Sequence, residues 1–300
     1  MDDKTFFEQL RSICSDAVES YRVEYPDAPP LTDSLLQSSD GPLASEADLH
    51  ERFDELTRFY DDLLDVDSTP YREMWREHLV YDCSRRERLA LLTSDLPASL
   101  TLVFIGGRYS ARTGRIGVSP GQLPETTAYT YLASELCHAY QHLFDSPTWM
   151  HPYLQEGFEQ AVSVRAQAHL AAELQHDSLT HLAKRQRTKT LLEGVLAHGT
   201  RRGGIERVAV RDLGVTDEEL AALHAHPLWR PLGYLRPRYR WSNVAFLPEY
   251  ALFGSMLLVS EETDVATTYA RAFHGDHPWT SIIDKITASP PGWLWHLYHR

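Results

Sequence analysis

Cysteine is scarce in this chain, and a long hydrophobic run is missing. The 300 residues include three cysteines, at positions 14, 83 and 137. An odd, sparse set without paired spacing excludes a disulfide framework and a cysteine-based zinc module. The longest apolar stretch, at 251–259, is shorter than the roughly 20 residues that a membrane-spanning helix needs. We therefore expect a globular protein with no membrane partner.

Lysine is almost absent too, although the chain is strongly charged. Acidic residues outnumber basic ones by 42 to 29, which gives a formal net charge of −13, and only four of the basic residues are lysines. This composition is halophile-like, because an acidic, lysine-poor surface stays hydrated in concentrated salt; a GC-rich genome produces the same preference for arginine. The net negative charge argues against nucleic acid as a partner of the whole surface. No secretory signal is visible, so a cytoplasmic location is expected.

Hydrophobic periodicity predicts a mainly α, α+β fold in which a small β-hairpin precedes a long helix. Strand-forming residues at 99–105, ended by a pair of glycines, are expected to pair with 114–119. We expect an N-terminal helical region at 1–95 and a second region at 96–300 with C-terminal helices, together one compact unit. The predicted helices span 6–21, 45–64, 71–92, 124–144, 153–174, 178–198, 249–260, 265–273 and 279–286.

The strongest chemical signal begins with the segment Ser134–His138 (Ser-Glu-Leu-Cys-His), on the helix expected at 124–144. Helical positions four apart share a face, so two side chains at this spacing can bind one metal ion. A third ligand must then come from a neighbouring helix. The break at 145–152 allows the next helix to fold back, and Glu156 lies in the first turn of that helix.

This stretch resembles the zincin metallopeptidases, and specifically the gluzincin group, whose third zinc ligand is a glutamate. The match covers about 99–175 and rests on Glu135, His138, Gln141 and Glu156, which is followed by glycine. The resemblance implies a zincin-like fold, a zinc cofactor held by His138 and Glu156, and a peptide or protein substrate. It also implies that Glu135 is the general base that takes a proton from the attacking water.

Two further residues receive roles from the same resemblance. Members of the family often carry a tyrosine in a later helix that stabilises the oxyanion, and the segment 249–254 implies this role for Tyr250. Glu159 lies one turn beyond Glu156. We expect Glu159 to orient the His138 ring without contacting the metal.

The sequence departs from the family at the first histidine of the His-Glu-x-x-His motif, where it has Ser134. A serine hydroxyl is a poor zinc ligand, because imidazole, thiolate and carboxylate are the usual donors. Three substitutes are open. His142 lies four residues after His138, so these two could pair one turn later, with Ala139 in the position of the general base. Alternatively, His151 could supply the ligand from the loop between the helices, or Ser134 could hold a water in its place.

These observations support three hypotheses. The first is a zincin-like metallopeptidase homologue with an altered zinc site that hydrolyses peptide bonds. The second is an inactive pseudopeptidase that binds a protein or peptide at the former active site. The third is a nucleic-acid-associated protein that uses the arginine-rich region at 184–240, where aromatic residues follow in its second half. Pairing of these arginines with the protein's own acidic residues is the simpler explanation of that region.

Overall fold

The computed structural model describes residues 3–28, 31, 41–79, 107–111, 113–118, 123–201, 243–261, 264–276, 283–284 and 287. Over these residues, eight α-helices, one short 3-10 helix and a two-stranded antiparallel sheet confirm the predicted mainly α, α+β fold. None of the helices described here has the length and apolar character needed to cross a membrane. The α-helices are α1 (Asp3–Glu24), α2 (Glu46–Leu64), α3 (Thr69–His78), α6 (Glu125–Leu143), α7 (Pro152–Leu174), α8 (Asp177–Arg201), α11 (Asn243–Ser260) and α12 (Val265–Phe273).

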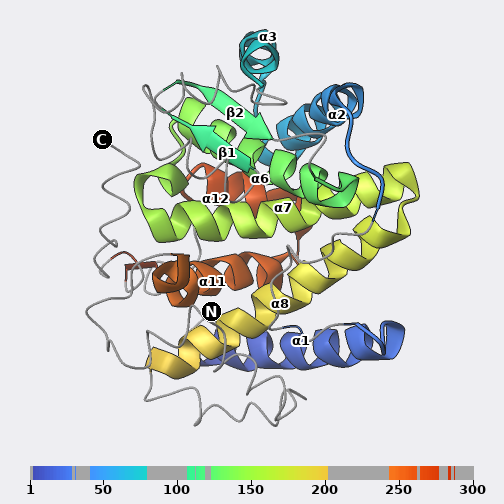
Figure 1. The fold of residues 1–300 in the computed structure, drawn as a ribbon. Helices are drawn as coiled ribbons and strands as arrows, with labels where there is room; N and C mark the ends of the chain where they lie inside the picture. The colour runs from blue at the N-terminus through green and yellow to red at the C-terminus, as the bar shows by residue number, and fades with distance from the viewer. Residues whose placement is uncertain are drawn as a thin grey trace.

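The helices form a stack in which α11 lies between α7 and α8, while α1 packs along α8 and also contacts α11 (Figure 1). The apolar stretch at 251–259 is buried throughout in α11. A helix that is apolar all round is stable only when neighbours enclose it, which explains the central position of α11. Buried apolar side chains of α1, α2 and the later helices form one continuous cluster.

Helix α6 is held in the structure by hydrogen bonds to α2 as well as by apolar packing. The Tyr60 hydroxyl of α2 donates to the backbone oxygen of Ala133 at 2.7 Å. In the opposite direction, the Tyr140 hydroxyl of α6 donates to the Thr57 oxygen at 2.9 Å and to Asp61 Oδ1 at 2.7 Å. These buried contacts fix the rotation of α6, and therefore which of its side chains face α7.

The break between α6 and α7 is confirmed, and its residues explain it. Asp145 adopts a left-handed backbone conformation with φ of 49°, which ends the helical path. The short 3-10 helix η2 (Pro147–Met150) follows, and the Ser146 side chain caps it by accepting from the Thr148 amide. His151 then caps α7, since its Nδ1 accepts from the Tyr153 amide at 3.3 Å.

The expected pairing of the hairpin is wrong. Strand β1 (Gly107–Ser110), and not 99–105, pairs with β2 (Arg115–Val118) in the register Gly107↔Val118 and Ser110↔Arg115. Gly107, which was expected to follow the first strand, is itself part of β1. A Cβ atom at Gly107 would lie 2.8 Å from the Tyr131 side chain of α6, so the strand requires glycine there to approach the helix. The turn is made later, where Gly114 has a φ of 65°.

Other predicted boundaries also shift. Helix α3 ends at His78, well before the expected 92, and residues 80–92 lie outside the described residues. The same holds for the expected strand at 99–105 and for most of the expected helix at 279–286. By contrast, the predicted start of α2 is confirmed, because Ser45 and Asp48 form a reciprocal capping box.

Candidate metal centre

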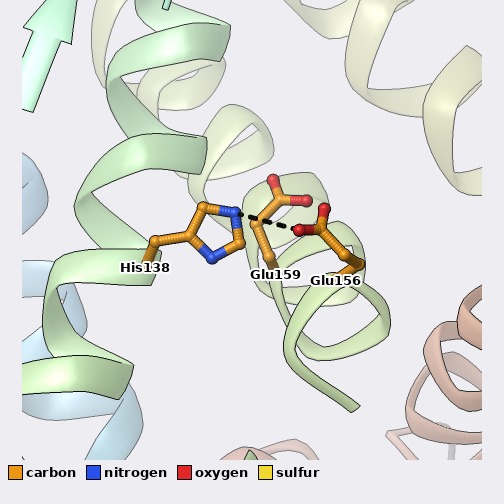
Figure 2. A group of neighbouring side chains, drawn as sticks. All are labelled: His138, Glu156 and Glu159. Carbon is orange, nitrogen blue, oxygen red and sulfur yellow. Dashed lines mark ion pairs between the residues drawn. The ribbon is translucent and has the colours of Figure 1, made fainter. Parts of the chain in front are cut away.

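Three side chains from α6 and α7 converge in the space between the two helices (Figure 2). His138 projects from α6, and Glu156 and Glu159 project from α7. One ligand atom from each lies within 4.8 Å of the others, and His138 Nε2 is 3.9 Å from Glu156 Oε1. Glu156 and Glu159 are three residues apart and so share one face of α7. Of the sequence-predicted ligands, the structure therefore brings His138 and Glu156 together, and adds Glu159.

The chemistry of this set suits a divalent metal ion. Imidazole nitrogen and carboxylate oxygen are both common zinc ligands, and two ligands about 2.1 Å from one tetrahedral ion lie about 3.4 Å apart. The 3.9 Å between His138 and Glu156 is close to that value. The His138 side chain is only 9% exposed while that of Glu156 is 40% exposed, so the carboxylate side of the group faces solvent.

Gln141 determines which nitrogen of His138 faces the carboxylates. The Gln141 Nε2 donates to the backbone oxygen of Gln155 at 3.1 Å and to Thr148 Oγ1 at 2.9 Å. A backbone oxygen can only accept, so the amide oxygen of Gln141 must point the other way, toward His138 Nδ1 at 3.0 Å. Nδ1 then carries the proton, and a neutral His138 presents the lone pair of Nε2 to the carboxylates.

The Gln155 side chain lies beside the same nitrogen. Its amide nitrogen is 3.4 Å from His138 Nδ1, and its Oε1 is buried without a hydrogen-bond partner. Exchanging the amide oxygen and nitrogen of Gln155 would offer Nδ1–H a second acceptor. Both glutamines thus act on the side of the imidazole that is turned away from Glu156, an arrangement typical of metal-binding histidines.

Ser134 lies one helical turn before His138 on α6, and its side chain acts to lower the pKa of Glu159, against the larger effect of burial. The residue at the position of the motif's first histidine therefore lies near one of the three converging side chains. Glu159 was expected to orient the His138 ring from outside the ligand set. Instead, it lies within ligand distance of the other two residues.

Glu135 is buried on α6 and is attached to the hairpin. The backbone N–H of Tyr109 in β1 donates to its carboxylate. Burial raises the pKa of Glu135, while His138 and Arg108 act in the opposite direction. A carboxyl group with a raised pKa beside a possible metal ligand is suited to proton transfer.

Burial and the neighbouring charges also shift the pKa values of His138 and Glu159. Burial alone would lower the pKa of His138, but the neighbouring carboxylates, led by Glu156, outweigh this effect and raise it. Burial raises the pKa of Glu159 to about 7, with His138 acting in the opposite direction. The group as a whole holds more carboxylates than cations and would be stabilised by a positive ion.

Comparisons with models of protein families, with curated proteins and with solved structures gave no match to this chain. The site must therefore be interpreted from its own geometry.

The other sequence-predicted residues lie elsewhere. His142 Nδ1 is hydrogen-bonded to the Tyr109 hydroxyl at 2.7 Å, and burial lowers the pKa of this histidine. His151 serves as the N-cap of α7. Neither belongs to the converging group, so the first two substitutes for the missing histidine are not realised in this arrangement. Tyr250 is part of α11, but its side chain is outside the described part of the structure, and its oxyanion role stays a prediction.

Sequence reasoning missed Tyr109 and Gln155. Tyr109 joins β1 to both Glu135 and His142, through its backbone N–H and its hydroxyl respectively. The hairpin was expected next to this helix, but 99–105 was expected to pair with 114–119, so Tyr109 was not expected in a strand. Gln155 directly precedes Glu156 in the sequence, and that position is the only signal that pointed to it.

Proposed function

We propose that this protein is a metal-dependent hydrolase related to the zincin peptidases, with His138 and Glu156 holding a divalent metal ion and a peptide bond as its substrate. One observation carries the proposal. A buried imidazole and a carboxylate from two consecutive helices face each other at 3.9 Å, with the far nitrogen of the ring already bonded to Gln141. This is the helix pairing that the motif requires.

The chain's own residues then supply the remaining chemistry. A divalent ion at this position would contribute Lewis acidity toward the substrate carbonyl. Glu135 takes the proton of the attacking water, which its raised pKa favours, and then passes that proton to the leaving amine. The Tyr109 amide holds one oxygen of this carboxylate and so sets its direction.

A second candidate is a non-catalytic relative that binds a peptide or protein at the same helix pair. Two observations favour it. Ser134 replaces the first histidine of the motif, and Glu135 is hydrogen-bonded to β1 through Tyr109. A carboxylate that already accepts a hydrogen bond from a strand backbone is less able to take a proton from water than a carboxylate without such a bond.

The third hypothesis, nucleic-acid binding through 184–240, has no support from the described residues. Lys184 pairs with Glu24 at 2.5 Å, Arg187 approaches Glu261 at 3.5 Å, and Lys189 pairs with Glu193. These bases satisfy the protein's own acids, as the simpler explanation expects. Residues 202–240 lie outside the described part of the chain.

Metal analysis combined with a peptidase assay tests the proposal. The purified chain is expected to contain about one equivalent of a divalent metal, and His138→Ala and Glu156→Gln should lose it. Glu135→Gln should keep the metal but lose hydrolysis of a mixed peptide library by about 100-fold or more. Glu173→Gln, an exposed change about 25 Å beyond Glu156 along α7, is the control and should alter neither.

The outcomes separate the two candidates. Metal binding without hydrolysis by the wild-type chain would favour the non-catalytic relative. Hydrolysis that survives Glu135→Gln unchanged would remove the proposed base. Absence of metal, even after incubation with zinc, would reject the metal-dependent proposal altogether.

A further inference from the structure

We infer that Glu159 is the third metal ligand, in place of the histidine that the zincin motif has at position 134. The inference rests on the proposed metal site and deepens it by naming the ligand set, which is His138, Glu156 and Glu159. The third ligand is thus supplied by α7 instead of α6. The resulting site offers one imidazole and two carboxylates to the ion.

The first argument is the position of the three donors. Among the described residues, these are the three metal-binding side chains whose donor atoms lie within 4.8 Å of one another. Glu156 and Glu159 reach the same point because residues three apart lie on one face of a helix. Figure 2 shows both carboxylates next to the ring nitrogen of His138 that points away from α6.

The second argument concerns the electrons at His138 Nε2. Gln141 accepts from Nδ1, so Nε2 is the ring nitrogen directed at the carboxylate oxygens. A positive species between these groups, either a proton on Nε2 or a metal ion, would stabilise them. A direct charge-assisted hydrogen bond would draw the atoms to about 2.7–2.9 Å. The 3.9 Å separation is too long for that contact and suits an ion that bridges the two groups.

The third argument is the position of Ser134. Its side chain is too short to replace histidine, and a hydroxyl is a poor zinc ligand. From one turn before His138 it acts instead on Glu159, whose pKa it lowers in part. The position that would carry the missing ligand thus lies beside the carboxylate that replaces it.

The ligand set has consequences for metal choice. Two carboxylates neutralise a divalent ion, whereas two imidazoles and one carboxylate leave a positive charge. Carboxylate oxygens suit manganese as well as zinc, while imidazole favours zinc. The advantage of Zn²⁺ over Mn²⁺ should consequently be smaller here than in a site with two histidines, and a second histidine should restore it.

Titration of the metal-free full-length chain with Zn²⁺ and, separately, with Mn²⁺ tests the inference by calorimetry. Loss of a group that only supports a ligand typically costs about 10–100-fold in affinity, and loss of a ligand costs more. Glu159→Gln should therefore weaken both metals by about 100-fold or more. Ser134→His should strengthen Zn²⁺ more than Mn²⁺. The exposed Glu173→Gln on α7 should bind as the wild type does.

A double variant separates the ligand role from a structural one. Ser134→His combined with Glu159→Gln should recover Zn²⁺ binding, because the imidazole replaces the lost carboxylate. A merely structural Glu159 would make Glu159→Gln lower Zn²⁺ affinity by the same factor with Ser134 and with His at position 134, whereas a ligand role predicts a smaller loss when the histidine is present. If Glu159→Gln binds both metals like the wild type while His138→Ala does not, Glu159 is no ligand and the proposed metal site stands without it. If the wild-type chain binds neither metal, both the inference and the proposed function are wrong.

Discussion

Gln141 is the residue on which the direction of the His138 ring depends. It is fully buried, and its amide bonds to three groups: the ring, the Thr148 hydroxyl and the Gln155 backbone. A single side chain thus connects α6, η2 and the first turn of α7. Because each bond has a fixed donor and acceptor, the amide orientation also sets the tautomer of the histidine.

Gln141→Leu should test this role. The substitution keeps the approximate size but removes the acceptor of Nδ1–H and the donor to the Gln155 oxygen. We expect metal affinity to fall by about 10–100-fold, and the free energy of unfolding of the metal-free chain to fall by about 1–3 kcal/mol because buried polar groups lose their partners. Urea unfolding and metal titration measure the two effects.

Gln141→Glu is the matched control. It keeps an acceptor for Nδ1–H and should retain more metal affinity than the leucine variant. Equal affinity of the wild type and Gln141→Leu would show that the ring needs no such support.

Among the helices, α11 determines how α7 and α8 are placed. Gly194 of α8 meets Ser255 of α11 so closely that a Cβ atom at 194 would lie 2.2 Å from Ser255 Oγ and 2.5 Å from its Cβ. At the end of α11, buried Glu261 accepts from Arg165 of α7 at 2.7 Å and also from the Tyr269 hydroxyl of α12. The start of α7, which carries the site, is supported by the same helix, since a Cβ at Gly254 would lie 3.0 Å from the Gly157 oxygen.

Gly194→Ala should be destabilising although alanine is the better helix former. The gain in helix propensity is about 1 kcal/mol. The overlap with Ser255 forces α8 and α11 apart, and we expect the free energy of unfolding to fall by about 1–3 kcal/mol. Adding Ser255→Gly should return part of the loss by making room for the new methyl group, as a double-mutant cycle in urea would measure. If Ser255→Gly returns none of the lost stability, the close approach of α8 to α11 is not the cause of the destabilisation.

For the whole molecule, the dominant long-range feature is the net charge of −13. Like charges on one surface repel each other and destabilise the compact state. Salt reduces this repulsion, because the Debye length falls from about 10 Å at 0.1 M to about 3 Å at 1 M. The charge composition therefore predicts that salt stabilises the folded chain, whichever organism the protein comes from.

We expect the Tm of the metal-free chain at pH 7.5 to rise steadily as KCl is increased from 0.1 to 1 M. The same series at pH 5.6, the isoelectric point calculated from the sequence, should give a much smaller rise because little net charge remains to be screened. Differential scanning calorimetry measures both series. Equal increases at the two pH values would assign the effect to general salting-out rather than to charge.

The features that the sequence determined without help are local ones. The positions of α6 and α7 followed from apolar spacing, and the break followed from residues such as Ser146 and Pro147 that end or begin helices within a few residues. Since the break is short, the meeting of His138 and Glu156 could also be expected from sequence spacing.

Tertiary structure alone decided which further groups joined them. The rotation of each helix about its own axis is set by contacts between residues far apart in the sequence, such as Tyr60 with Ala133. The residue pattern of α7 alone does not indicate this rotation. For this reason Glu159 was expected beside the site and lies in it, while His142 turned to Tyr109. The pairing of β1 was missed for a similar reason, because a glycine that is typical of a turn is needed at 107 for the close approach to Tyr131.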